Sequence, residues 1–139
     1  MRLLLDTCII SEMRKADASP NVKKLINEVD ETDMFISVIS LGEIVKGISL
    51  LEDGKRKKEL FSWINGLERI FTSRILEIDQ ETAHIWGEVT AKAMRAGKIV
   101  PACDGLIAAL ALRHGLHLVT RNAEDFKPTG VLFIDPWVN

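Results

Sequence analysis

Short apolar runs alternate along this chain with longer segments that have helical periodicity. The first run, Leu3–Leu5, consists of three leucines and is followed at once by a charged residue. Runs of this kind are typical of strands that are buried on both faces of a parallel sheet. We predict strands at residues 3–5, 34–38, 75–78 and 116–120, and a fifth at residues 131–134.

Helical segments lie between these runs, and residues typical of helix ends flank several of them. Gly97 and Gly115 stand where helices should end. Ser40, with Glu43 three residues later, matches the S-x-x-E capping box that begins many helices. We predict helices at residues 7–15, 21–29, 40–51, 80–96 and 102–113, and another that begins at Asp53. Strands that alternate with helices in this way predict an α/β sandwich with a small, mostly parallel central sheet.

The composition limits the class of protein. The 139 residues suit one domain, and because no linker divides them we predict a single domain over residues 1–139. The longest strongly apolar stretch, residues 106–112, is far shorter than the roughly 20 residues that a membrane span needs. The apolar run at the N-terminus is interrupted by Asp6, too early for a signal peptide. These features predict a cytoplasmic protein that does not enter a membrane.

Several kinds of site are excluded by the motifs that are missing. The formal net charge of −2 argues against tight direct binding to DNA. The two cysteines and three histidines lack the spacing of zinc ligands. The glycine-rich nucleotide-binding loops are absent, as is a Ser-His-Asp arrangement. A phosphatase of the haloacid dehalogenase type needs D-x-D after the first strand, but here the third residue of that triplet is Cys8.

Four carboxylates stand where a parallel sheet would bring them to one edge. Asp6 directly follows the first predicted strand, Glu43 and Asp104 lie in the first turns of predicted helices, and Asp125 follows the fourth strand. Ligands of such sheets bind beyond the carboxyl ends of the strands. Carboxylates set in apolar sequence are costly unless they are paired or bind a metal, and all-oxygen ligands favour Mg²⁺ or Mn²⁺. Two such ions suit the hydrolysis of a phosphodiester.

Each of these carboxylates also has an ordinary structural explanation. Asp6 and Asp104 could be helix caps, since an aspartate at a strand end or helix start usually is one. Glu43 could be half of a capping box with Ser40, and Asp125 could be a solvated loop residue. Position alone therefore leaves both metal binding and simple capping open.

The sequences around the carboxylates resemble the motifs of PIN-domain nucleases. Leu3–Glu12 resembles their opening strand and D-T-N-x-x-[ST]-E turn, and Ile36–Ile48 resembles I-S-x-x-[ST]-x-x-E-[IL]-x-x-G. Asp104–Ala111 is similar to their D-x-x-I-A-A helix, and Leu118–Phe126 to the last motif, [VT]-x-[ST]-x-[DN]-x-x-[DE]-F. Asp135–Trp137 resembles the N-P-W tail of the VapC and FitB branch. The matches follow one another in order over nearly the whole chain.

The resemblance implies a PIN-like three-layer sandwich, a single PIN domain over residues 1–139, and a metal-dependent endoribonuclease. Mg²⁺ would be the cofactor, and Mn²⁺ could replace it. Asp6, Glu43, Asp104 and Asp125 would be both the metal ligands and the catalytic residues. Proteins of this branch are toxins of type II toxin–antitoxin pairs. The implied partners are therefore an RNA substrate, a small VapB-like antitoxin, a second copy of the chain, and DNA only through the antitoxin.

The resemblance also implies supporting roles around the acidic cluster. Thr7, Ser40 and Asn122 would form hydrogen bonds that orient the carboxylates. Arg121 adjoins the last motif and is a candidate RNA contact. Cys8 departs from the family pattern, which usually has asparagine at this position, and a thiol is a poorer hydrogen-bond partner than an amide.

Two further features bear on RNA binding. The basic run Lys55–Lys58 could be a patch that contacts phosphates, but the solvated face of a helix is the favoured interpretation, because Glu52, Asp53 and Glu59 surround it. The sequence shows no aromatic platform for stacking bases. The alternative to a nuclease is a degenerate PIN domain that binds RNA or protein without cleaving it. The presence of all four carboxylates argues against this alternative.

Overall fold

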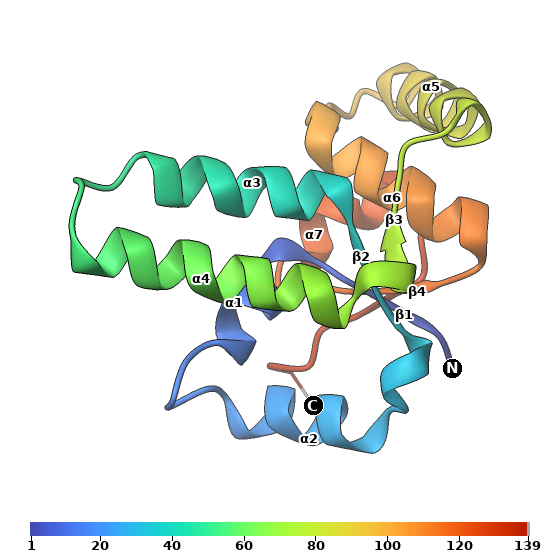
Figure 1. Cartoon of the computed structure of the whole chain (residues 1–139). Helices are drawn as coiled ribbons and strands as arrows, with labels where there is room; N and C mark the ends of the chain where they lie inside the picture. Colours follow the sequence, from blue (N-terminus) through green and yellow to red (C-terminus); the bar gives the residue numbers. More distant parts are fainter. Residues whose placement is uncertain (139) are drawn as a thin grey trace.

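The computed structural model describes residues 1–138 and has a five-stranded parallel sheet at its centre (Figure 1). The strand order is β3-β2-β1-β4-β5, and every described pairing is parallel. The predicted α/β fold with a small parallel sheet is confirmed, whereas the predicted domain boundary at Asn139 lies outside the described residues. The strands are β1 (Leu3–Leu5), β2 (Met34–Ser37), β3 (Ile75–Leu76), β4 (His117–Val119) and β5 (Phe133–Ile134).

Helices connect these strands and cover both faces of the sheet (Figure 1). Short 3₁₀ turns at Glu31–Asp33, Thr72–Arg74 and Lys127–Thr129 precede β2, β3 and β5. The α-helices are α1 (Thr7–Met13), α2 (Pro20–Glu28), α3 (Val38–Ser49), α4 (Lys55–Ile70), α5 (Gln80–Arg95), α6 (Ala102–His114) and α7 (Ala123–Phe126).

The beginning of α3 corrects the predicted capping box. Ser37 is the N-cap, and its side-chain oxygen accepts a hydrogen bond of 3.0 Å from the backbone N–H of Ser40. Ser40 is therefore inside the helix and fully buried, and Glu43 lies in the second turn rather than the first. Because the Ser37 side chain already accepts a hydrogen bond from the Ser40 N–H at the start of the helix, Glu43 is not needed for capping and is free for another role.

Two other helix starts also differ from the prediction. The helix expected at Asn21 begins at Pro20, whose missing N–H suits the first helical position. The helix expected at Asp53 begins at Lys55, after Gly54 with a φ of 156°. The predicted ends at Gly97 and Gly115 are confirmed, because both glycines have the positive φ of a helix terminus.

The alternation of side chains along β1 separates two hydrophobic cores. Leu3 and Leu5 point into one core with Ile9 of α1 and Ile64 of α4, whereas Leu4 points into the other. The second core is formed mainly by α6, including Leu110. All three leucines of β1 are fully buried. The molecule therefore has three layers, helices, sheet and helices, as expected.

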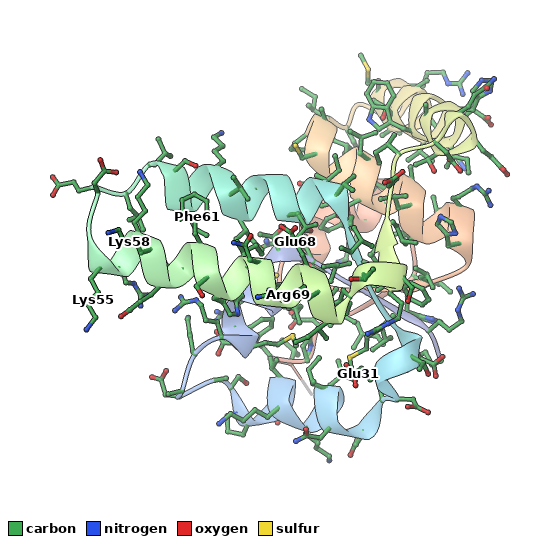
Figure 2. All side chains as sticks on the ribbon, viewed as in Figure 1. Glu31, Lys55, Lys58, Phe61, Glu68 and Arg69 are labelled. Carbon is green, nitrogen blue, oxygen red and sulfur yellow. The ribbon has the colours of Figure 1, made fainter. Side chains whose placement is uncertain are left out.

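Helices α3 and α4 form an antiparallel pair that extends beyond the sheet (Figure 1). Lys55 and Lys58 lie at the outer end of this pair, where α4 begins (Figure 2). Lys55 pairs with Glu59, and Lys57 pairs with Asp53, so the basic run is partly neutralised by its neighbours. In the described residues, no helix combines the length and apolar character needed to cross a membrane.

Candidate active site at the carboxyl edge of the sheet

Asp6 leaves the carboxyl end of β1 and is held by hydrogen bonds on both carboxylate oxygens. Oδ1 accepts a hydrogen bond of 2.8 Å from the backbone N–H of Thr7, and Oδ2 accepts one of 2.7 Å from the hydroxyl of Thr120. The Asp6 backbone N–H donates to the carbonyl of Val119, which extends the β1–β4 pairing. Asp6 is the N-cap of α1, as one of the alternatives held, but it is also 94% buried. Capping alone does not require such burial.

Glu43 reaches the same edge from α3, and Thr7 connects it to the end of β1. The hydroxyl of Thr7 donates a hydrogen bond of 2.7 Å to Oε1 of Glu43 and also lies 3.0 Å from the Ser40 oxygen. Thr7 and Ser40 thus lie where a role in orienting a carboxylate was expected. A single hydroxyl, one residue after Asp6, fixes the glutamate relative to that aspartate.

Asp104 lies in the first turn of α6 and carries the most perturbed carboxylate of the group. Burial is the largest cause, and together with the negative charges of Asp6, Asp125 and Glu43 it raises the pKa of Asp104 to about 6. No group among residues 1–138 donates a hydrogen bond to its carboxylate to offset these effects. The other three carboxylates therefore lie near enough to Asp104 to affect its pKa.

Asp125 comes to this region from α7, and its side chain is exposed. The neighbouring Asn122 does not act as predicted. Its side chain donates no hydrogen bond to a carboxylate in the part of the chain that the structure describes, whereas its backbone N–H donates to the hydroxyl of Thr120 at 3.0 Å. Asn122 therefore contacts Asp6 only indirectly, through Thr120.

Thr120 is the site residue that sequence reasoning missed. It follows β4 directly, is fully buried, and donates to a carboxylate 114 residues earlier in the chain. The available signal was its place in the last motif, one residue after an apolar strand. That position resembles the position of Asp6 after β1, and adjacent parallel strands bring both ends together.

Cys8, which departs from the family pattern, also lies against Asp6. Its sulfur is 3.8 Å from Oδ2 of Asp6 and 3.9 Å from the Thr120 oxygen, and it accepts a hydrogen bond from the backbone N–H of Arg121. Burial is the main cause that raises the pKa of this thiol, which keeps it protonated and able to donate weakly to the carboxylate. Cys8 and Cys103 are both free thiols.

The donor set of this edge fits a hard divalent cation. All the acidic groups are carboxylates, and Asp104 has neither a hydrogen-bond donor nor a counter-charge of its own in the described chain. Within residues 1–138, no three carboxylate, thiol or imidazole side chains already lie close enough together to hold one ion. Because like charges repel, the carboxylates stay apart when no cation lies between them. To bind an ion, they would have to move closer together around it.

The family model described as "PIN domain" matches residues 3–131. The chain belongs to the PIN-domain family. The resemblance seen in the four sequence motifs is therefore confirmed.

Curated PIN-domain relatives match this chain over almost their full length. It is 32% identical to Toxin FitB of Neisseria gonorrhoeae over 136 residues, covering 97% of this chain and 98% of that protein. It is 30% identical to the tRNA(fMet)-specific endonuclease VapC of Shigella flexneri, covering 99% of this chain and 98% of that protein. It is 29% identical to the VapC ribonuclease Y4jK of Sinorhizobium fredii, covering 97% of both chains.

Solved PIN-domain structures have the same fold. FitAcB from Neisseria gonorrhoeae superposes with a TM-score of 0.92 at 32% identity, covering 99% of each chain. The DNA-bound VapBC complex from Salmonella typhimurium superposes with a TM-score of 0.78 at 28% identity, covering 98% of each chain.

Proposed function

We propose that this PIN-domain protein is a metal-dependent endoribonuclease that acts as the toxin of a type II toxin–antitoxin pair. The observation that carries the proposal is the environment of Asp104. Its half-buried carboxylate has no donor in the described chain, and burial together with three neighbouring carboxylates raises its pKa to about 6. A carboxylate that is destabilised in this way is the kind of group that a bound cation stabilises.

Asp6, Glu43, Asp104 and Asp125 would hold Mg²⁺, or Mn²⁺ in its place. Once bound, the ion would supply the positive charge that activates water and stabilises the oxygens of a phosphodiester. The chain itself prepares two of the ligands. Thr120 and the Thr7 backbone fix Asp6, while the Thr7 hydroxyl fixes Glu43, so part of the site is already oriented before any substrate arrives.

The names of the relatives support RNA as the substrate and toxicity as the biological role. Relatives at 29% to 32% identity are named as a toxin, a ribonuclease and a tRNA endonuclease. They match this chain from end to end rather than through one segment, which supports the transfer of the reaction class. The RNA itself is a separate question, because specificity depends on the rim of the site and on RNA shape.

A groove beside the site supports a protein partner. It has a volume of about 230 Å³ and lies between α1, α3 and α4, where Thr7, Glu43, Ile44, Leu60 and Trp63 contribute to its walls. Thr7 and Glu43 of the candidate active site thus form part of its wall, and the rest is mostly apolar apart from Ser11 and Arg14. We propose that a small VapB-like antitoxin covers this groove and the carboxylates together, and that DNA is contacted only through the antitoxin. A homodimer in the cytoplasm completes the proposed assembly.

Cleavage of RNA by the purified protein tests the proposal. Wild type should cleave RNA with Mg²⁺ or Mn²⁺ and stop when the metal is chelated. Asp104→Asn should reduce cleavage by at least ~10²-fold, because it removes one ligand charge from the site. Asp6→Asn should act in the same way. Asp30→Asn is the matched control, since Asp30 is exposed and its side chain caps no helix; it should cleave like wild type.

Growth inhibition and metal binding complete the test. Expression of wild type should stop growth, and co-expression of the small neighbouring reading frame should restore it. Cleavage by Asp104→Asn and Asp6→Asn at the wild-type rate would contradict the acidic site. Absence of both Mn²⁺ binding and metal-dependent cleavage by wild type would favour the degenerate, non-catalytic PIN domain.

A further inference from the structure

Arg121 and Trp137 are neighbours because β4 and β5 are adjacent parallel strands. The backbone N–H of Thr120 donates to the carbonyl of Ile134, so the chain leaves both strands at the same level. Oδ1 of Asp135 then accepts a hydrogen bond of 3.0 Å from the N–H of Trp137, which stabilises a turn after β5. The turn places the indole ring against Arg121, with the guanidinium carbon 4.8 Å from the ring centroid.

The two side chains of this pair differ in exposure and packing. Trp137 is half-buried and packs against the core that contains Leu3 and Leu5. Arg121 is exposed. The indole is therefore a fixed surface, and the guanidinium lies on its solvent side, where stacking restricts the orientation of an otherwise flexible side chain.

Arg121 is also tied to the acidic cluster. Its backbone N–H donates to the Cys8 sulfur at 3.4 Å, and that sulfur lies 3.8 Å from Oδ2 of Asp6. Among residues 1–138, no carboxylate lies within ion-pair distance of the Arg121 guanidinium. Its positive charge and its donors thus remain available for a ligand, on a residue whose backbone adjoins the acidic cluster.

We propose that Arg121 binds a phosphate of the RNA strand at the acidic cluster, and that Trp137 is a positioning residue that holds the guanidinium for this contact. The proposal rests on RNA being the substrate, as proposed above. A guanidinium binds phosphate through N–H groups in its own plane. Stacking on indole occupies one face of that plane and leaves the N–H edges free. The aromatic residue thus supports the arginine rather than stacking a base itself.

The competing basic surface lies elsewhere. Lys55 and Lys58 are at the outer end of the α3–α4 pair (Figure 2), and Lys55 is paired with Glu59. Arg121, in contrast, immediately follows Thr120, whose hydroxyl donates a hydrogen bond to Asp6. The backbone of Arg121 therefore lies beside the carboxylates where cleavage is proposed to occur, which is not the case for Lys55 or Lys58.

Binding of RNA to a cleavage-deficient protein tests the arginine. In the Asp104→Asn background, the probe is a short fluorescein-labelled single-stranded RNA of mixed sequence, and fluorescence anisotropy gives Kd. Arg121→Ala should weaken binding about 10-fold and lower the slope of log Kd against log salt by about 0.7, as expected for one lost phosphate contact on a single strand. Arg95→Ala, an exposed arginine of α5, removes the same charge elsewhere and should change neither quantity.

Variants of Trp137 separate positioning from folding. Trp137→Leu should weaken binding about 2- to 5-fold and leave the salt slope unchanged, because the charge remains but loses its stacking surface. Trp137→Phe keeps an aromatic face and should restore binding to within about twofold. In the Arg121→Ala protein, Trp137→Leu should have no further effect, since there is no guanidinium left to position.

Cleavage kinetics with Asp104 intact give a second readout. Arg121→Ala and Trp137→Leu should raise KM more than they lower kcat. Equal RNA binding by Arg121→Ala and Arg95→Ala would overturn the inference while leaving a cleaving wild type, and thus the proposed function, intact. If Trp137→Leu weakened RNA binding further in the Arg121→Ala protein, the positioning role of Trp137 would be overturned, whereas the phosphate contact of Arg121 would not. If wild type bound and cleaved no RNA, both proposals would fail together.

Discussion

The hydroxyl of Thr120 at the end of β4 donates a 2.7 Å hydrogen bond to Oδ2 of Asp6 at the end of β1, across 114 residues of sequence. Both residues are buried. This hydrogen bond joins the two central strands at the edge where the carboxylates gather, so it affects the stability of the fold and the geometry of the site together.

Thr120→Val should lower both the stability of the protein and its affinity for a metal ion. Valine has nearly the same shape but leaves a buried carboxylate oxygen with only the weak Cys8 thiol as a donor. We expect the free energy of unfolding to fall by about 1–2 kcal/mol, measured by urea denaturation, and the affinity for Mn²⁺ to fall about 10-fold or more, measured by calorimetry. Thr120→Ser keeps the hydroxyl and is the control. A Thr120→Val protein as stable as Thr120→Ser would show that this hydrogen bond is unimportant.

Asp104→Asn should make the metal-free protein more stable at neutral pH. The pKa of Asp104 is raised to about 6 in the folded state, so between about pH 4 and 6 the folded protein binds more protons at this site than the unfolded chain does. Stability from this group is therefore lost as the pH rises through that range. Asparagine avoids this loss, which we put at about 1 kcal/mol after allowing for solvent screening, or a Tm increase of about 2–4 °C.

The control for this prediction is to measure the effect of Asp104→Asn on stability at two pH values. Thermal melts with a chelator should show the increase at pH 7.5 and little difference near pH 3, where this aspartate is mostly protonated in both states. A gain of the same size at both pH values would mean that the effect of the substitution is not electrostatic.

Gly105→Ala should destabilise the protein although glycine is a poor helix former. A Cβ at this position would lie 3.0 Å from both Cδ1 and Nε1 of Trp86, so the indole would have to move by a few tenths of an ångström within the α5–α6 contact. We expect a loss of about 1 kcal/mol, because the overpacking exceeds the gain in helix propensity. Gly87→Ala in α5 is the matched control; no atom lies within 4 Å of its added Cβ.

Chemical denaturation of the two variants gives the measurement. Gly87→Ala should stabilise the protein by about 0.5–1 kcal/mol, opposite in sign to Gly105→Ala. Since Gly105 directly follows Asp104, Gly105→Ala should also reduce cleavage, whereas Gly87→Ala should not. Stabilisation by both alanines would show that the α5–α6 contact tolerates a methyl group without strain.

The sequence predicted the features that depend on local pattern. The apolar run Leu3–Leu5 identifies a buried strand, and its alternation explains why Leu4 faces a different core from its neighbours. The carboxyl ends of parallel strands must lie at one edge, and this was enough to place Asp6 and Asp125 in the same region. Boundaries at glycine with positive φ, such as Gly115, were also predictable.

Contacts between distant segments were not predictable from local pattern. Ser37 and Ser40 are both plausible caps, and only the point where β2 ends decides between them. Asn122 and Thr120 are both polar residues after β4, but the pairing with β1 gives Thr120, rather than the Asn122 side chain, the hydrogen bond to Asp6. The stacking of Arg121 on Trp137 likewise depends on β5 lying beside β4.

The position of β1 between β2 and β4 has a consequence for the growing polypeptide on the ribosome. Asp6 is synthesised before β4 and Thr120, which complete its surroundings and come 114 residues later for Thr120. Domains fold as units as they are made, and contacts between distant segments form late. A chain made only as far as α6 therefore lacks a complete acidic edge, and the proposed nuclease becomes competent only after β4 and Thr120 have been made.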